Sequence, residues 1–182
     1  GAYSTFIGHL AGQGITGTKL TGNYNTAVGY SSGLKFQGDC VENTAIGAVA
    51  LQDNTTGSYN TAVGYVSLAN NITADYNTAV GYYSAVGNTT GTKNTAVGAD
   101  SLRANQTGDD NTAIGRSALV ANTGDRNTAV GAFSGDVISS GIDNVMIGYA
   151  AGTHNVNLTT GRYNTVIGSY ADVGQADADA AN

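Results

Sequence analysis

The sequence predicts an all-β protein, a β-solenoid of about ten coils with about 17 residues in each. The five-residue word Asn-Thr-Ala-Val-Gly and its close variants occur ten times in 182 residues. Successive copies begin 21, 18, 17, 17, 17, 17, 16, 17 and 20 residues apart, and a period this short indicates stacked units rather than a globule with a central cleft. The 27 glycines and the absence of proline suit many tight turns joined by uninterrupted backbone hydrogen bonding.

We number the positions of the repeat from the Asn of the motif, which is position 1. The recurring residue at each position then predicts a structural role. Glycine occupies position 5 in all ten units, as expected where φ is positive or another backbone approaches closely. Asparagine recurs at position 1, so its amides are expected to stack and hydrogen-bond along the rod. Position 8 is always Ala or Ser, which indicates a site for a small side chain. The clearest copies contribute the motif residues Asn60, Thr61, Ala62, Val63, Gly64, Asn77, Ala79, Val80 and Gly81.

The composition of each unit predicts short strands and turns rather than helices. Asn, Thr, Gly and β-branched residues dominate, and no apolar spacing of 3.6 residues extends over a helical length. The Thr-Ala-Val and Ser-Leu segments are expected to form two short strands in each coil, separated by Gly and Asn-Thr turns. Because neighbouring strands lie about 4.8 Å apart, ten coils predict a rod on the order of 45–50 Å long.

Both faces of the Thr-Ala-Val strand are uncharged, since Thr and Val point one way and Ala points the other. Such a strand is expected to be buried on both sides. The unit 94–110 offers only Val97 and Leu102 as bulky aliphatic residues, too few to fill a coil that stands alone. We therefore expect an oligomer in which Val and Ile fill the coil interior, while alanines such as Ala62 and Ala96 face a shared axis.

The ten units resemble the head domains of YadA-like trimeric autotransporter adhesins. They are still more similar to the Asn-Thr-Ala-Val-Gly-Tyr repeats of phage tail fibres and bacterial surface fibres, which residues 60–76 and 77–93 follow well. The resemblance covers residues 4 to about 171 and implies a left-handed parallel β-roll that forms a homotrimer. The coils are longer than the YadA head repeat, so their cross-section and loops are expected to differ. We assign 1–174 to the repeat domain and 175–182 to a C-terminal transition or tail segment.

The resemblance also implies a function, namely a trimeric fibre or adhesin head that attaches to a host, prey or other cell surface. Its partners would be copies of itself and a cell-surface glycan or protein receptor. Its location would be extracellular, on a bacterial cell surface or in a phage tail fibre. Two alternatives stay open: a ligand-free structural shaft, and an ice-binding solenoid that uses regular rows of Thr. The second is weakened because Thr is expected to share a buried face with Val.

Composition and motif content argue against several other functions. A net charge of −6 with seven Lys and Arg residues disfavours a nucleic-acid partner, which requires clustered basic residues. No run approaches 18 consecutive apolar residues, so no membrane insertion is expected. Gly12–Gly17 matches G-x-G-x-x-G but lacks the strand and helix of a dinucleotide site. No catalytic set of Ser, His and acid, and no pair of carboxylates, recurs, so we expect no enzyme activity and no cofactor.

The metal-ligating residue types are also poorly placed. His9 and His154 occupy unlike positions in distant units, without a second His or Cys near either one in the sequence, so no metal site is expected from them. The acidic turns around Asp109 and Asp143 offer oxygen ligands for Ca²⁺, but a solvated edge is the favoured interpretation. Cys40 is the only cysteine and is expected to be a small buried residue.

Two surfaces are candidates for ligand binding. Tyrosines recur immediately before the motif and immediately after its glycine, which predicts columns of stacked rings that either cover the coil edges or form a glycan-stacking surface. Units that break the period offer the second surface, because insertions in solenoids map to loops that often bind. The candidate ligand-binding residues are Lys35, Phe36 and Gln37 in such a loop, and Tyr30, Tyr65, Tyr82 and Tyr149 after the glycine.

Overall fold

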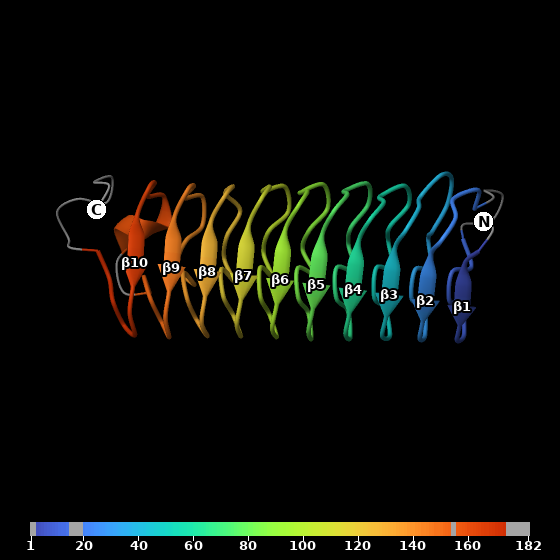
Figure 1. The fold of residues 1–182 in the computed structure, drawn as a ribbon, viewed down its shortest axis with the longest axis horizontal. Helices are drawn as coiled ribbons and strands as arrows, with labels where there is room; N and C mark the ends of the chain where they lie inside the picture. The colour runs from blue at the N-terminus through green and yellow to red at the C-terminus, as the bar shows by residue number, and fades with distance from the viewer. Residues whose placement is uncertain (1–2, 15–19, 154–155, 174–182) are drawn as a thin grey trace.

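In the computed structural model, which describes residues 3–14, 20–153 and 156–173, the chain forms a rod around one parallel sheet (Figure 1). The ten strands lie side by side in sequence order, so the predicted β-solenoid is confirmed. The predicted tail, 175–182, lies outside the described residues. The elements are β1 (Thr5–Ile7), β2 (Thr26–Val28), β3 (Thr44–Ile46), β4 (Thr61–Val63), β5 (Thr78–Val80), β6 (Thr95–Val97), β7 (Thr112–Ile114), β8 (Thr128–Val130), β9 (Val145–Ile147), the 3₁₀ turn η1 (Val156–Thr159) and β10 (Thr165–Ile167).

The repeat sets the register of the sheet, because each motif position lies over the same position of the next coil. Thr61 pairs with Thr78 and Ala62 with Ala79, and the same alignment holds from β1 to β10. The second predicted strand, the Ser-Leu segment, is a turn instead. Leucine at position 9 takes a left-handed conformation, with φ of 50° at Leu51, and such a residue ends an extended backbone. Each described coil therefore carries one strand, and turns close the rest.

The assignment of the strand faces predicted from the sequence is wrong. Alanine at position 3 points into the coil and is fully buried from β2 to β8, whereas Thr, Val and Ile lie on the outer face. The Val80 side chain is 36% exposed and that of Ile46 is 41% exposed. Alanine takes the inner position because the coil is thin, and the wall opposite the strand leaves room only for a small side chain beneath it.

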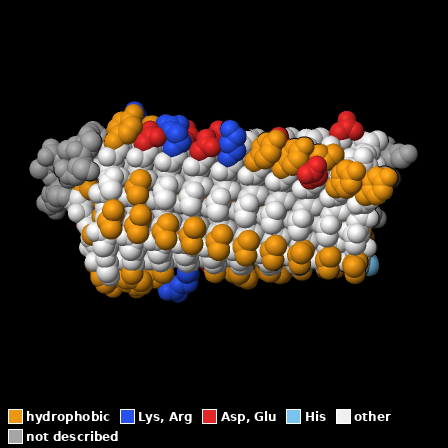
Figure 2. Space-filling model, viewed as in Figure 1, with side chains coloured by type: hydrophobic (Ala, Val, Ile, Leu, Met, Phe, Trp, Pro, Cys, Tyr) orange, Lys and Arg blue, Asp and Glu red, His pale blue; other side chains and the backbone are white. Residues whose placement is uncertain are grey.

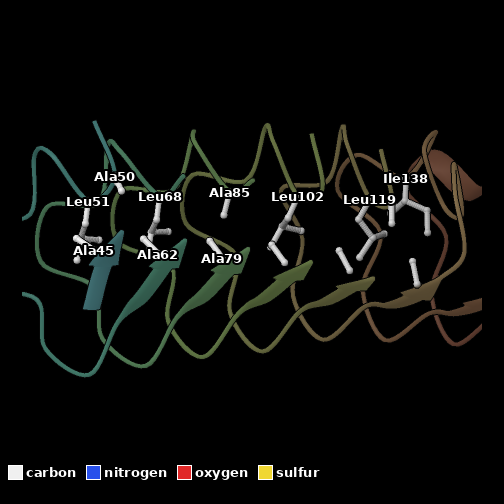
Figure 3. Close-up of a cluster of buried hydrophobic side chains, with 14 of the residues drawn as sticks. Ala45, Ala50, Leu51, Ala62, Leu68, Ala79, Ala85, Leu102, Leu119 and Ile138 are labelled. Atoms are coloured by element: carbon white, nitrogen blue, oxygen red, sulfur yellow. The ribbon is translucent and has the colours of Figure 1, made fainter. Parts of the chain in front are cut away.

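Two facing walls fill the coil interior, with Ala at position 3 on one side and Leu at position 9 on the other (Figure 3). Leu68 and Leu102 are fully buried there. Where Met146 replaces the alanine, position 9 of the same coil is Gly152, and a Cβ on this glycine would lie 2.7 Å from the Met146 sulfur. The expectation that one chain lacks the apolar residues to fill its coils is therefore also wrong, because little more than one Leu and one Ala is required.

The predicted ladder of asparagines at position 1 is confirmed. The side chain of Asn77 accepts a hydrogen bond from the backbone N–H of Asn94 at 2.9 Å and donates one to the Gly91 carbonyl at 2.8 Å. A second ladder, which the sequence did not predict, runs through position 12, where Asn88 donates to the side chain of Asn71 at 3.1 Å. The asparagines of both ladders are buried. Their amide hydrogen bonds link each coil to the next inside the protein, where an unpaired polar group would be especially costly.

Replacing one ladder residue should measurably destabilise the rod. Asn77→Ala leaves the buried N–H of Asn94 without an acceptor, and we expect the free energy of unfolding to fall by about 2 to 4 kcal/mol. Urea denaturation followed by circular dichroism measures this change. Asn70→Ala is the matched control, since Asn70 is exposed and its loss should cost less than about 0.5 kcal/mol. Equal effects of the two substitutions would contradict a structural role for the ladder.

The other invariant positions of the motif also behave as predicted. Glycine at position 5 has a positive φ, which reaches +140° at Gly81. Ser84, at position 8, is buried and donates a hydrogen bond to the Gly81 carbonyl at 3.2 Å. The small residue at position 8 therefore packs inside the bend that the glycine makes.

Candidate functional site

The outer face of the sheet is the most regular surface of the molecule, and we refer to positions 2 and 4 of all ten strands as the Thr/Val face. Figure 2 shows its apolar side chains as a continuous row along the rod. No charged residue belongs to this face. Its members are Thr5, Ile7, Thr26, Val28, Thr44, Ile46, Thr61, Val63, Thr78, Val80, Thr95, Val97, Thr112, Ile114, Thr128, Val130, Val145, Ile147, Thr165 and Ile167.

One edge of the Thr/Val face is formed by the residue immediately before each motif. These residues are left-handed in every coil, with φ between 55° and 61°. Tyr59 and Tyr76 stack with ring centroids 4.8 Å apart, whereas Arg126 donates a hydrogen bond to Asp143 at 2.6 Å, which lowers the pKa of that carboxyl. This first edge column, seen along the upper rim in Figure 2, consists of Tyr3, Tyr24, Glu42, Tyr59, Tyr76, Lys93, Asp110, Arg126, Asp143 and Tyr163.

The opposite edge is formed by the residue immediately after the motif glycine. Tyr65 stacks on Tyr82 with ring centroids 5.7 Å apart, and His9 stacks on Tyr30 at the same centroid distance. The predicted columns of stacked rings are therefore confirmed, although they form short runs that other residues interrupt. The second edge column consists of His9, Tyr30, Ala48, Tyr65, Tyr82, Ala99, Arg116, Ala132, Tyr149 and Ser169, and the four candidate tyrosines in it are 46% to 57% exposed.

The candidate loop at Lys35, Phe36 and Gln37 does not present its aromatic ring to solvent. Phe36 is fully buried, and Lys35 forms an ion pair with Asp53 at 2.9 Å. Phe36 occupies position 12 of its coil, in line with the buried asparagines of the second ladder, and its ring fills the space over Gly33 at position 9. Aligning position 12 across the units would have placed Phe36 in the core, so the expectation of an exposed aromatic loop is wrong.

A hollow of about 230 Å³ lies beside the second edge column and is lined by Tyr82, Tyr83, Asp100 and Arg103. The ring centroids of Tyr82 and Tyr83 lie 4.5 Å apart, and the two ring planes are tilted by 48°. The Arg103 guanidinium lies over the Tyr83 ring at 5.8 Å and pairs with Asp100 at 3.3 Å. The pKa of Tyr82 is raised by desolvation and by the neighbouring Tyr83 and Tyr65. The sequence analysis predicted Tyr82 but not the other three residues, and the signal for two of them is a single acid at position 7, Asp100, and a single base at position 10, Arg103.

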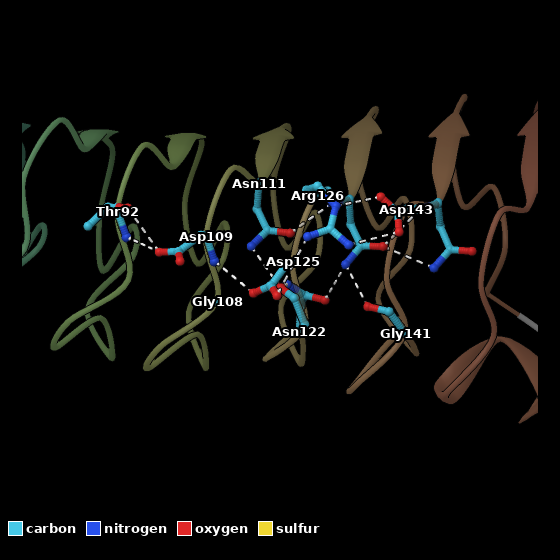
Figure 4. A network of polar contacts seen from close by, with 12 residues as sticks. Thr92, Gly108, Asp109, Asn111, Asn122, Asp125, Arg126, Gly141 and Asp143 are labelled. Atoms are coloured by element: carbon cyan, nitrogen blue, oxygen red, sulfur yellow. Dashed lines mark hydrogen bonds and ion pairs between the residues drawn. The ribbon is translucent and has the colours of Figure 1, made fainter.

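The acidic turns hold the backbone of the preceding coil (Figure 4). Asp109 accepts hydrogen bonds from the backbone N–H of Thr92 at 2.6 Å and from its hydroxyl at 3.0 Å. Asp125 accepts one from the N–H of Asp109 at 3.0 Å. In the part of the chain that the structure describes, no group of three His, Cys, Asp or Glu side chains is placed to hold a metal ion. The carboxylates of these turns therefore act as caps between coils.

Cys40 is fully buried, as predicted, and its burial raises the pKa of the thiol to about 11. The thiol ionises more easily in the unfolded chain, so unfolding releases a proton at high pH. We expect the contribution of Cys40 to stability to be fully present below about pH 8 and to be lost as the pH rises toward 11, with a slope of up to about 1.4 kcal/mol per pH unit. Urea denaturation of the wild type and of Cys40→Ala at several pH values measures the difference, because tyrosine ionisation is common to both chains. Identical pH profiles would contradict this assignment.

No helix among the described residues is both long enough and apolar enough to cross a membrane. Comparison of the chain with family models, curated proteins and solved structures gives no match.

Proposed function

We propose that this chain is a segment of a homotrimeric fibre, and that the fibre is an attachment head directed at a cell surface. The observation that carries the proposal is the apolar row of the Thr/Val face, which runs from one end of the rod to the other without a charge. Soluble monomers rarely expose continuous apolar patches larger than a few hundred Å², and larger ones mark interaction sites. The occupant that fits this face is a second copy of the same chain.

A second copy of the chain can match the Thr/Val face because its own Thr/Val face has the same spacing between residues. Interfaces between identical chains place equivalent rows at the same spacing, so each Val or Ile can pack at the level of a partner's Val or Ile. The strands are parallel within the chain, and three rods that point the same way can turn their Thr/Val faces toward one axis. This arrangement supports a trimer in which the alanines stay inside each coil rather than at the axis.

The attachment role is supported by what such an assembly leaves uncovered. The turns between the second edge column and the next motif remain on the outside, and they carry the residues that vary most from coil to coil. In solenoids the repeat provides the scaffold and the variable positions provide recognition.

The mass in solution tests the assembly, and cell binding tests the attachment role. Light scattering should give three times 18.3 kDa, about 55 kDa, and the labelled protein should bind to whole bacterial or host cells. A mass of one chain would refute the trimer. A trimer that binds no cell in a broad panel would favour the ligand-free shaft instead.

Ice binding is a second candidate function. The sequence analysis disfavours it because Thr would share a buried face with Val, but in the single chain the Thr and Val rows both lie on the outer face. Threonine pairs with threonine in register from β1 to β8, which gives a regular array of hydroxyl and methyl groups. Thermal hysteresis from a monomeric protein, lost in Thr78→Tyr, would favour this function. Its absence at millimolar protein would refute it.

A further inference from the structure

We infer that the hollow lined by Tyr82, Tyr83, Asp100 and Arg103 is a binding subsite for the ring of a neutral hexose at the end or side of a glycan. The inference deepens the proposed attachment role and rests on it. It assigns the recognition to one place on the rod, the turns that follow β5 and β6, rather than to the tyrosine columns as a whole.

The aromatic part of the site consists of two stacked rings, Tyr65 and Tyr82, and a third ring, Tyr83, that is tilted against them. Tyr65 and Tyr82 stack at 5.7 Å with ring planes only 16° apart, and they are 49% and 54% exposed. Tyr83 meets this pair at a tilt of 48° to Tyr82 and 52° to Tyr65. Exposed aromatic faces of this kind pack against the C–H groups of one side of a sugar ring, and the phenol hydroxyls remain available for hydrogen bonds. The hollow is smaller than the roughly 300 to 1,000 Å³ of pockets for drug-sized ligands, so it suits a single ring.

The polar residues supply the complementary chemistry for sugar hydroxyls. The Asp100 carboxylate accepts hydrogen bonds and the Arg103 guanidinium donates them, and both side chains reach the hollow. Their separation of 3.3 Å makes them an ion pair with side chains 29% and 55% exposed. Since the two charges offset one another, and the whole chain carries a net charge of −6, the site favours a neutral sugar over an acidic one.

The scaffold does not require these residues. One coil before Tyr83 the same position is Val66, and one coil before Arg103 it is Val86. Neighbouring coils therefore close in the same way with aliphatic side chains. Position 7 varies from coil to coil and is also aromatic at Phe133 and Tyr170, but only this coil pairs an acid at position 7 with a base at position 10. Such variable positions are where recognition is expected in a solenoid.

In the proposed trimer, three of the four residues that line the hollow lie away from the Thr/Val face, and Tyr82 lies at its edge. None of its four lining residues belongs to a strand, and so none belongs to the Thr/Val face. Tyr82 follows the glycine bend that ends β5, and Tyr83, Asp100 and Arg103 lie beyond the bends of their own coils. Packing through the Thr/Val face thus leaves the ion pair and the Tyr83 ring at the surface of the assembly.

Saturation-transfer NMR with the methyl glycosides of glucose, galactose, mannose and N-acetylglucosamine tests the subsite on the intact protein. We expect transfer to the ring protons of at least one neutral glycoside with a Kd on the order of 1 mM. Tyr83→Ala and Arg103→Ala should each weaken binding by about tenfold. Tyr59→Ala is the matched control, because Tyr59 is also exposed and stacked on a tyrosine but lies in the first edge column, and it should bind as the wild type does.

Each other outcome overturns a stated part of the inference. No transfer to any of the four glycosides, or transfer that survives both Tyr83→Ala and Arg103→Ala, would overturn the subsite. The methyl glycoside of N-acetylneuraminic acid is added to the panel, and a clear preference for it over the four neutral glycosides would overturn the neutral specificity. Light scattering on the same samples separates this result from the proposed assembly: a trimer without sugar binding rejects only the subsite, and a monomer that binds sugar rejects only the trimer.

Discussion

The double variant Val63→Lys, Val80→Lys is expected to remain folded and to have the mass of one chain, 18.3 kDa, whereas the proposed trimer of the wild type would have about three times that mass. Both side chains lie in the middle of the Thr/Val face, and both are partly exposed in the single chain. A lysine at either position can therefore reach solvent in the monomer. In the trimer, six ammonium groups would be buried near one axis without partners, and burying each unpaired charge costs several kcal/mol.

The control for this prediction adds the same charge elsewhere. The variant Ile72→Lys, Thr90→Lys places two lysines on exposed turn residues outside the strands, and it should keep the mass of the wild type. Light scattering gives the masses, and circular dichroism shows that both variants are folded. If the Val63→Lys, Val80→Lys chain kept the full oligomeric mass, the Thr/Val face would not be the interface.

Gly81→Ala, which adds one methyl group, is expected to destabilise the rod strongly, as the same substitution should at the other glycines of position 5. A Cβ at this site would lie 2.6 Å from the carbonyl oxygen of Gly98 in the next coil, and the backbone already has a φ of +140°. The contact is with backbone, so no side-chain rotation relieves it, and both coils must move apart at the sheet. We expect the free energy of unfolding to fall by about 3 to 5 kcal/mol, seen as a lower midpoint in urea.

The matched control for Gly81→Ala is Gly38→Ala. Gly38 also has a positive φ, +57°, but the nearest atom to its Cβ position is the Thr56 methyl carbon at 3.9 Å. Only the left-handed conformation opposes the alanine there, at a cost of about 1 kcal/mol. Similar losses of stability in the two variants would mean that conformation, rather than the close approach of stacked coils, explains the glycine at position 5.

The period of the motif was sufficient to predict the solenoid, the register, the amide ladder and the glycine bend. These features share one physical cause: when identical units stack, each position meets itself in the next coil, and the residue must suit that contact. Asn77 and Gly81 could therefore be interpreted from recurrence alone. Phe36 stands in a unit that breaks the period and so resembles a loop residue, but counting from the motif puts it in line with the buried asparagines at position 12.

The stacking of the coils, and the set of positions that repeat from coil to coil, follow from the period alone. Which side of the strand faces inward depends on how the folded coil is filled. The alternation of Thr, Ala and Val is the same for either choice, since a strand presents every second residue to each side. The thickness of the coil made the difference: Leu102 on the opposite wall leaves room for Ala96 and not for Val97. The period already stacks Tyr83 on Asp100, since both occupy position 7, but only the structure shows that the Arg103 side chain turns toward both of them.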